Sequence, residues 1–338
     1  MLISDLGERG LLKLIQPYCL PNTIGDDGAI VHPPIGCELV VTTDVLVDGV
    51  HFSDRTTTAF DVGWRSVAAN LSDLAAMGAT PLGITVGLSL PPTLPVVWLD
   101  WLYQGMQACL ERYGTGIIGG DLTRSSVATV AITALGAVRK DRIIKRSTAQ
   151  IGDAIVVTGD HGDSHAGLQL LLDPELGQDR NFIDRADLQK HREILISAHQ
   201  RPQPRLDILP ILEQLHANAS QVFSVAGMDS SDGLADAIVQ ICQASKVGAV
   251  LDRSTMPISP SLSQMFPDTA LDSALYGGED FELVLCMPES IALELVEKIG
   301  RGAAIIGQIG RSPDIILIDD LTEDAPIYLN RQSGFQHF

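Results

Sequence analysis

The amino-acid sequence predicts a two-domain α/β (α+β) protein. At 338 residues, the chain is longer than one average domain, so two domains are expected. Hydrophobic residues make up 45% of the sequence and aromatic residues only 5%, which favours cores built from aliphatic side chains. The 31 glycines and 18 prolines are spread along the chain and mark turns between short elements. The polar segment at residues 139–152 is the predicted boundary, giving domains at residues 1–140 and 141–338.

The first domain is predicted to contain strands on either side of two helices. Residues 38–46 are rich in β-branched side chains and predict a strand that follows an irregular N-terminal region. Asp61 is predicted to cap a helix that runs to about residue 77 and stops at Gly78. The remaining elements are a strand at 82–90, a helix at 94–113, and strands at 115–118 and 127–138 joined through Gly119, Gly120 and Asp121.

The second domain alternates between predicted strands and predicted helices. Strands are predicted at residues 154–158, 222–225, 249–251, 282–287 and 304–309. Helices are predicted near residues 164–172, 187–199, 205–216, 233–245 and 290–299. This alternation is typical of an α/β domain.

The net charge limits the partners that the protein can have. Lys and Arg total 23 against 42 Asp and Glu, so the formal net charge is −19. Such a chain repels nucleic acid and anionic membrane surfaces, so neither is an expected partner. It also repels a phosphorylated substrate, unless divalent cations reverse the local charge. The acidic excess has a second explanation, because it also favours solubility.

The cysteines and the N-terminus indicate the compartment. The five cysteines are scattered without a C-x-x-C pair, which argues against a disulfide framework or a zinc site. The N-terminus lacks the basic start and the apolar run of a signal peptide. No uninterrupted apolar run reaches membrane-spanning length. A soluble, cytoplasmic protein is therefore expected.

Two common nucleotide-binding signatures do not explain phosphate binding in this chain. Residues 114–119 fit G-x-G-x-x-G, but they follow a predicted helix and enter a predicted strand. A dinucleotide fold needs this motif after a strand and at the start of a helix, so we interpret the segment as a turn and a strand. No G-x-x-x-x-G-K-[ST] motif occurs. If ATP binds, something other than a Walker lysine holds its phosphates.

Acidic residues recur beside Gly, Ser or Thr, mostly at the ends of predicted elements. Taken singly, each has a local explanation: Asp232 could cap a helix, and Asp27 and Asp121 could lie in turns. As a set they lie where α/β folds open binding crevices, and oxygen ligands suit the Mg²⁺ that bridges carboxylates to phosphates. The acids stand within residues 25–28, 42–44, 70–73, 119–121, 229–233 and 277–280. We interpret the set as a dispersed metal site that holds ATP phosphates.

Three further residues are candidates for contacts to a phosphate or a base, each with a structural alternative. His51 follows the first strand and could touch an anion, or be a surface histidine. Arg146 could neutralise a phosphate without a metal, or be an exposed linker charge. Tyr113 stands at a helix end and could stack on a base, or be a core aromatic residue.

Together these segments resemble the thiamine-monophosphate kinase family, within the superfamily that includes aminoimidazole ribonucleotide synthetase. The resemblance covers nearly the whole chain, with the segments in the family's order. The segments are Ile24-Gly25-Asp26-Asp27, Thr42-Thr43-Asp44, Gly49-Val50-His51-Phe52, Asn70-Leu71-Ser72-Asp73, Gly119-Gly120-Asp121, Lys145-Arg146-Ser147, Ile151-Gly152-Asp153, Arg201-Pro202-Gln203-Pro204-Arg205, Ser231-Asp232-Gly233-Leu234, Gly277-Gly278-Glu279-Asp280 and Gly334-Phe335-Gln336-His337-Phe338.

The resemblance implies a reaction, a fold and an assembly. The reaction is phosphorylation of thiamine monophosphate to thiamine diphosphate by ATP, through direct in-line transfer assisted by several Mg²⁺ ions. The fold is that of aminoimidazole ribonucleotide synthetase, with an N-terminal domain for ATP and Mg²⁺ binding and for dimerisation. In the implied homodimer, the N-terminal domains pair their sheets and each C-terminal α/β domain closes over the nucleotide. No catalytic general base is expected, because the acceptor phosphate is already ionised at neutral pH.

By position, the resemblance also implies three groups of site residues. The metal ligands are Asp27, Thr42, Thr43, Asp44, Asp73, Asp121, Asp229 and Asp232. The ATP contacts are Asp27, Tyr113, Gly120, Asp121, Arg146 and Ser231. The thiamine-phosphate contacts are His51, Glu279 and Phe335. The chain has Ser230, Phe281 and Phe335 where the family commonly has Ile, Tyr and Tyr, and Phe335 thereby loses one hydroxyl from the pocket.

Two alternatives to this hypothesis come from different classes. One is another ATP-using member of the superfamily, such as aminoimidazole ribonucleotide synthetase or selenophosphate synthetase. The latter normally carries a reactive Cys or selenocysteine in a glycine-rich N-terminal stretch, which is missing here. The other is a non-catalytic regulator that binds nucleotide or Mg²⁺, against which the complete ligand set argues.

Overall fold

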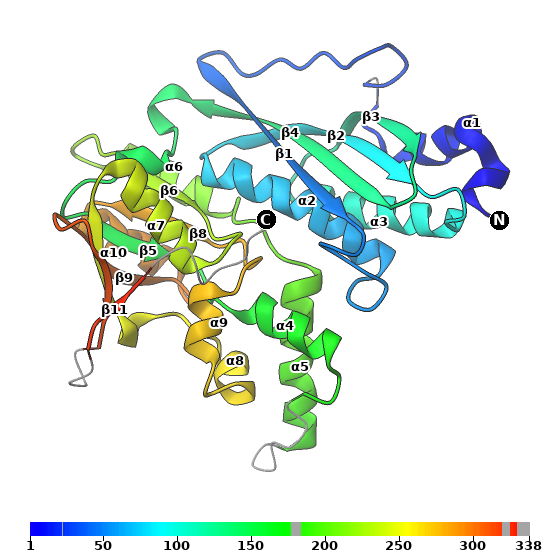
Figure 1. Cartoon of the computed structure of the whole chain (residues 1–338). Coiled ribbons are helices and arrows are strands. Elements are labelled where there is room, and N and C mark those ends of the chain that lie inside the picture. The colour runs from blue at the N-terminus through cyan, green and yellow to red at the C-terminus, as the bar shows by residue number, and fades with distance from the viewer. Residues whose placement is uncertain (22, 177–183, 320–324, 330–338) are drawn as a thin grey trace. The chain divides into compact units, whose positions relative to one another are not determined.

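The computed structural model describes residues 1–21, 23–176, 184–319 and 325–329 (Figure 1). The chain divides into two units, Met1–Leu74 with Ala79–Lys140, and Ala75–Gly78 with Asp141–Phe338. Each unit combines helices with one sheet, which confirms the predicted mixed α/β class. Within the described ranges, every helix is too short or too polar to span a membrane.

The first unit is built on a sheet with the strand order β1-β4-β2-β3. β1 is antiparallel to β4, β4 is antiparallel to β2, and β2 is parallel to β3. Helices α2 and α3 lie along one face of this sheet (Figure 1). The bounds are β1 Cys37–Val47, α2 Ala59–Ala76, β2 Thr80–Leu90, α3 Val96–Arg112, β3 Ile117–Arg124 and β4 Thr129–Arg139. The predicted strands and helices of this part of the chain are confirmed, with shifted ends.

Three details of the first unit differ from the predictions. The N-terminal region is not irregular, because it contains α1 (Ile3–Ile15), kinked at Gly7, and η1 (Gln16–Tyr18). Asp61 does not cap α2: the Thr58 hydroxyl accepts the Asp61 N–H at 3.3 Å, so the cap lies three residues earlier. Residues 119–121 do not connect two strands but lie inside β3.

The helices α2 and α3 approach each other closely at two glycines. A Cβ atom at Gly63 would lie 2.0 Å from the carbonyl oxygen of Leu102. A Cβ atom at Gly105 would lie 1.9 Å from the carbonyl oxygen of Phe60. Both obstacles are helix backbone, which cannot move aside as a flexible side chain would. The contact therefore requires glycine on both helices.

The second unit contains a seven-stranded mixed sheet in the part of the chain that the structure describes. Its strand order is β11-β10-β7-β9-β5-β8-β6, and β10 and β7 are its parallel pair. The strands are β5 Ala154–Val157, β6 Ala226–Asp229, β7 Gly248–Asp252, β8 Leu283–Met287, β9 Ala304–Gly310, β10 Ile315–Ile318 and β11 Ile327–Tyr328. The helices are α4 Asp163–Leu172, α5 Arg185–Gln200, α6 Ile208–Asn218, α7 Leu234–Ser245, α8 Pro260–Met265, α9 Ala270–Tyr276 and α10 Glu289–Ile299, with short turns η2 Lys140–Arg142, η3 Arg146–Thr148 and η4 Arg253–Thr255.

One predicted strand of the second unit is wrong. Three of residues 222–225 are β-branched or aromatic, but Val222 is 97% exposed and the strand is β6, which follows them. All four residues of β6 are buried beside β8, so packing overrides the local β propensity.

The helices α8 and α9 and the strands β10 and β11 were not predicted. The buried apolar core of this unit includes Ile155, Val157, Ile238, Ile241 and Val284.

We expect Gly105→Ala to lower the free energy of unfolding by about 2 kcal/mol or more, because the added methyl group meets helix backbone. All three tryptophans lie in α2 and α3, at residues 64, 98 and 101, so urea unfolding followed by tryptophan fluorescence reports on this unit. Gly28→Ala is the control, because its Cβ would enter open space. Equal stability of the two variants would contradict the glycine contact.

Candidate functional site

In the first unit, β1 and α2 bring three of the predicted metal ligands together. Thr42 and Asp44 are two apart on β1 and therefore share one face of the strand. The Thr42 hydroxyl donates to the Asp73 carboxylate on α2. The backbone N–H of Asp44 donates to Asn70 Oδ1 at 3.1 Å, and the Asn70 amide in turn donates to the Ser66 carbonyl oxygen at 2.9 Å. The result is a cluster of hydroxyl and carboxylate oxygens, held by the strand and the helix.

Thr43 and Asp121 lie on the opposite face of the same sheet. Side chains alternate along a strand, so Thr43 points away from α2, and its hydroxyl lies 2.7 Å from the Thr133 hydroxyl. Asp121 pairs with Gly87, which pairs with Ala131, and all three therefore share a face with Thr43. Within this unit the structure does not bring these two predicted ligands to the Thr42–Asp73 cluster.

Of the other predicted site residues of the first unit, Gly120 lies inside β3, and His51, Asp27 and Tyr113 lie at turns or at a helix end. His51 Nδ1 accepts the Val47 N–H at 3.1 Å, so the proton of a neutral His51 is on Nε2. Asp27 is exposed in a bend before β1. Tyr113 ends α3, and the Arg112 guanidinium lies 5.8 Å from the centre of its ring.

In the second unit, two loops are joined by backbone hydrogen bonds. We call residues 229–233, which begin at the last residue of β6, and residues 277–282, which precede β8, the paired loops. The Ser230 N–H donates to the Glu282 carbonyl oxygen at 2.9 Å, and the Glu279 N–H donates to the Ser231 carbonyl oxygen at 2.7 Å. A Cβ atom at Gly278 would lie 2.7 Å from that Ser231 oxygen, so the close approach needs glycine.

The paired loops carry four predicted site residues. Asp229 is buried at the end of β6, and its carboxylate accepts a 3.4 Å hydrogen bond from the Ser231 hydroxyl. Asp232 is exposed, and it does not cap α7, because the N-cap residue is Gly233 and no side chain caps this helix. Glu279 follows the glycines of the second loop, and its carboxylate lies 3.7 Å from His199 Nδ1.

The second paired loop has an unusual backbone. Glu279 has φ 68° and Phe281 has φ 54°, in the left-handed region that non-glycine residues rarely adopt. Such conformations cost of order 1 kcal/mol or more each and persist only where surrounding contacts impose them. The surrounding contacts are therefore expected to fix this loop in one conformation.

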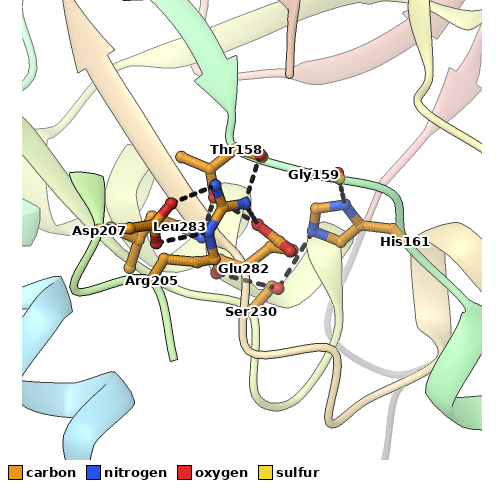
Figure 2. Close-up of polar contacts among 8 residues, drawn as sticks. All are labelled: Thr158, Gly159, His161, Arg205, Asp207, Ser230, Glu282 and Leu283. Atoms are coloured by element: carbon orange, nitrogen blue, oxygen red, sulfur yellow. Dashed lines mark hydrogen bonds and ion pairs between the residues drawn. The ribbon is translucent and has the colours of Figure 1, made fainter. Parts of the chain in front are cut away.

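Two buried carboxylates supply those contacts. Asp280 accepts the N–H groups of Gly162 and Ser164 at the start of α4, at 2.7 and 2.9 Å. Burial raises the pKa of Asp280 to about 8, although these donors favour the ionised form. Glu282 accepts from the Thr158 hydroxyl and from Arg205 Nη1, each at 2.5 Å (Figure 2).

A buried histidine lies behind the first paired loop. His161 is fully buried, and Figure 2 shows its ring between the Gly159 carbonyl and the Ser230 hydroxyl, at 3.0 and 3.1 Å. A carbonyl only accepts, so Nδ1 carries the proton and Nε2 accepts from Ser230. Burial lowers the pKa of His161 from 6.5 to about 4. The ring is therefore neutral at physiological pH. Its two hydrogen bonds connect the Gly159 carbonyl with Ser230 on the first paired loop.

Arg146 lies in η3 beside α7, and its Nη1 donates to Gln240 Oε1 at 2.7 Å. The hydroxyl of Ser245 at the end of α7 donates to the Arg146 carbonyl oxygen at 2.8 Å. The guanidinium is thus tied to a helix rather than lying in a loose linker. The remaining predicted residue, Phe335, lies outside the described residues.

Sequence reasoning did not find that His161, Arg205 and Glu282 hold the paired loops, and it counted Asp280 among the acids of the metal site rather than as a support of the loop. A signal for Glu282 was present, because it stands directly before an apolar strand, where a carboxylate needs a partner. Among the described residues, no three His, Cys, Asp or Glu side chains gather in a metal-binding group. The predicted ligands are instead divided between the two units.

Comparison with known proteins gives the chain's relatives. Models of the AIR synthase related protein family match residues 25–138 with the N-terminal domain and residues 150–320 with the C-terminal domain. The chain is 50% identical over 337 residues to the thiamine-monophosphate kinase of Synechococcus elongatus, covering 99% of this chain and 98% of the relative.

Solved structures of similar proteins have the same fold. The crystal structure of thiamine-monophosphate kinase from Stenotrophomonas maltophilia K279a is 34% identical, with a TM-score of 0.76 over 91% of this chain and 95% of that one. A structure of AaThiL complexed with AMPPCP and TMP is 28% identical, with a TM-score of 0.71 over 100% of this chain and 99% of that one.

The buried His161 predicts a pH dependence of stability. Between pH 6.5 and pH 4 the unfolded chain binds a proton at this histidine that the folded chain does not, so the contribution of His161 to the free energy of unfolding falls as the pH falls. The loss attributable to His161 is about 3 kcal/mol. Urea unfolding followed by circular dichroism should show that, on lowering the pH, the free energy of unfolding changes less favourably in the parent than in His161→Gln by about this amount, because carboxyl groups such as Asp280 contribute equally to both chains. His32→Gln, at an exposed position, should match the parent; an equal loss in all three chains would refute the prediction.

Proposed function

The chain belongs to the AIR synthase related family and to its thiamine-monophosphate kinases, and we propose that it transfers the γ-phosphoryl group of ATP to thiamine monophosphate. The observation that carries the proposal is the 50% identity to a thiamine-monophosphate kinase over 99% of the chain. The product of the transfer is thiamine diphosphate, and ADP leaves. The relative complexed with AMPPCP, a non-hydrolysable analogue of ATP, and TMP supports this substrate pair.

We propose Mg²⁺ as the cofactor, because the chemistry of the donor set fits it. Thr42, Asp44 and Asp73 offer only hydroxyl and carboxylate oxygens in one cluster, and oxygen is the ligand that Mg²⁺ prefers. Asp229 and Asp232 would hold metal in the second unit, and Asp27, Thr43 and Asp121 complete the proposed set. When bound, Mg²⁺ would neutralise phosphate charge in an in-line transfer that needs several ions.

The chain's own residues would orient the two phosphates. Arg146, Ser231, Tyr113, Asp27, Gly120 and Asp121 are the proposed ATP contacts. At Gly120 a Cβ atom would lie 2.2 Å from the Val86 carbonyl oxygen, so the strand presents bare backbone there. His51 would donate from Nε2 to the phosphate of thiamine monophosphate, because its Nδ1 already accepts from Val47. Glu279 and Phe335 are the other proposed contacts of that substrate.

No side chain is needed to remove a proton from the acceptor. A phosphate oxygen is already ionised at neutral pH, so the reaction requires positioning and charge neutralisation rather than a general base. The rigid backbone of the paired loops supplies positioning for Ser231 and Glu279. We therefore assign no catalytic acid or base. We propose residues 1–140 as the domain for ATP and Mg²⁺ binding and for dimerisation, and residues 141–338 as the C-terminal α/β domain.

The purified chain, incubated with ATP, Mg²⁺ and thiamine monophosphate, is expected to produce thiamine diphosphate and ADP, measured by chromatography. Asp44→Asn should lower turnover by about 100-fold or more, because it removes a charged oxygen from the proposed metal site. Tryptophan fluorescence would check that the variant is folded.

Asp268→Asn, a change of the same kind at an exposed residue, is the control and should retain parent turnover. Absence of thiamine diphosphate with the parent chain would overturn the proposed reaction. Near-parent turnover of Asp44→Asn would remove Asp44 from the metal site without affecting the rest of the proposal.

We also propose a homodimer that pairs the exposed face of β1. Leu39, Val41 and Val45 are 47%, 57% and 45% exposed on this face, which is costly for apolar side chains in water. An edge strand with such a face is suited to pairing with a second copy. Asp121 lies on the same face of the sheet, so it would be near the pairing surface rather than near Asp44.

Light scattering after size-exclusion chromatography should give twice the 36.2 kDa chain mass. Val41→Asp is expected to shift the protein to the monomer, because it places a charge in the apolar face. Leu293→Asp on α10 is the control: Leu293 is also 57% exposed, and its variant should remain dimeric. A monomeric parent, or a dimeric Val41→Asp variant, would contradict pairing through β1.

A further inference from the structure

The second arginine of Arg201-Pro202-Gln203-Pro204-Arg205 has no part in the proposed reaction, yet its side chain is only 14% exposed. Its Nη1 donates to Glu282 and to the Thr158 carbonyl oxygen, both at 2.5 Å. Its Nε and Nη2 donate to the two oxygens of Asp207, both at 3.0 Å (Figure 2). The guanidinium therefore uses three of its nitrogen atoms on fixed partners.

Glu282 connects this arginine to the paired loops. Its carboxylate faces Arg205 and the Thr158 hydroxyl, while its backbone carbonyl accepts the Ser230 N–H at 2.9 Å. The carboxylate fits closely, since a Cβ atom at Gly159 would lie 2.4 Å from Glu282 Oε1. The next residue continues the link, because the Leu283 N–H donates to the Thr158 hydroxyl at 2.9 Å. Displacing the carboxylate would therefore displace both loops.

The charge of Arg205 is what makes this arrangement stable. Burial raises the pKa of Glu282 because water is removed from the carboxylate, and Arg205 acts against that shift. A buried carboxylate that loses its cation is strongly destabilised, so it would move towards water or bind a proton. Either change would release Phe281, whose φ of 54° needs the fixed neighbours on both sides.

We propose that Arg205 is a positioning residue for phosphoryl transfer, which acts through Glu282 to hold the paired loops in the geometry that their ligands require. The inference rests on the proposed function, because Ser231, Asp232 and Glu279 on these loops are its substrate and metal contacts. Arg205 itself touches none of these three residues through the hydrogen bonds of Figure 2. Its effect is therefore on orientation, and a misplacement of about 1 Å costs about 100-fold in rate.

The test measures kcat, KM and thermal stability for four variants of the whole chain. Arg205→Ala should lower kcat by about 10- to 100-fold while the variant remains folded at the assay temperature. Arg205→Lys should recover part of the loss, because it keeps a charge on Glu282 but lacks the planar fork. Glu282→Gln should also lower kcat, and the double variant Arg205→Ala/Glu282→Gln should be no slower than the slower single variant, because both changes break one link.

Arg253→Ala is the matched control, since Arg253 is 45% exposed and pairs with Asp319 at 3.7 Å. Its kcat should stay within about twofold of the parent, as expected for a surface ion pair. A kcat of Arg205→Ala within twofold of the parent, with only its melting temperature lowered, would show a purely structural role and overturn the inference. If Arg205→Ala does not fold, the same criterion applies to Arg205→Lys and Glu282→Gln.

Calorimetric binding of AMPPCP with Mg²⁺ separates this inference from the proposed function. Arg205→Ala should bind the analogue about tenfold more weakly than the parent does, because the first paired loop carries Ser231. A parent that binds AMPPCP but makes no thiamine diphosphate would overturn the substrate assignment alone. If Arg205→Ala binds AMPPCP as tightly as the parent does, and its kcat equals that of the parent, the positioning role is overturned.

Discussion

A buried ion pair between Glu282 and Arg205 links the side chains of the second unit to its backbone. The carboxylate is stable in this largely buried position because a guanidinium and the Thr158 hydroxyl replace the water it has lost. The backbone carbonyl oxygen of Glu282 accepts the Ser230 N–H. The residue whose charge Arg205 compensates therefore also positions the first paired loop. Asp280, two residues earlier, uses its carboxylate on the start of α4. The strained backbone between the two acids is held from both ends.

The proposed reaction explains why an acidic protein would be built this way. Two phosphate-bearing substrates repel each other and also repel a chain with a net charge of −19. The first unit contributes an oxygen cluster on β1 and α2, in which the Thr42 hydroxyl donates a hydrogen bond to the Asp73 carboxylate. The second unit contributes the paired loops, which backbone hydrogen bonds hold together. Under the proposed reaction, these acids would be sites for cations that neutralise phosphate charge.

The sequence predicted local patterns well and long-range contacts poorly. Local patterns located β1 and α2, and acids beside Gly and Ser marked both paired loops. The sequence could not place β6, because its Ala-Gly-Met-Asp residues have low β propensity and are held by burial beside β8. It could not find the partner of Glu282 either, since Arg205 is 77 positions away and such a contact leaves no local signal. Family resemblance supplied the site residues that periodicity alone left ambiguous.

The two faces of strand β1 differ in chemistry, and this limits which mutations the strand can accept. Thr42 and Asp44 face α2, whereas Val41, Thr43 and Val45 face the other way. Inserting or deleting a single residue within β1 would exchange the two faces beyond that point. The acid would then enter the apolar face, and valine would replace it in the oxygen cluster. A point substitution in this strand therefore leaves the division between its two faces intact, whereas a change in its length does not.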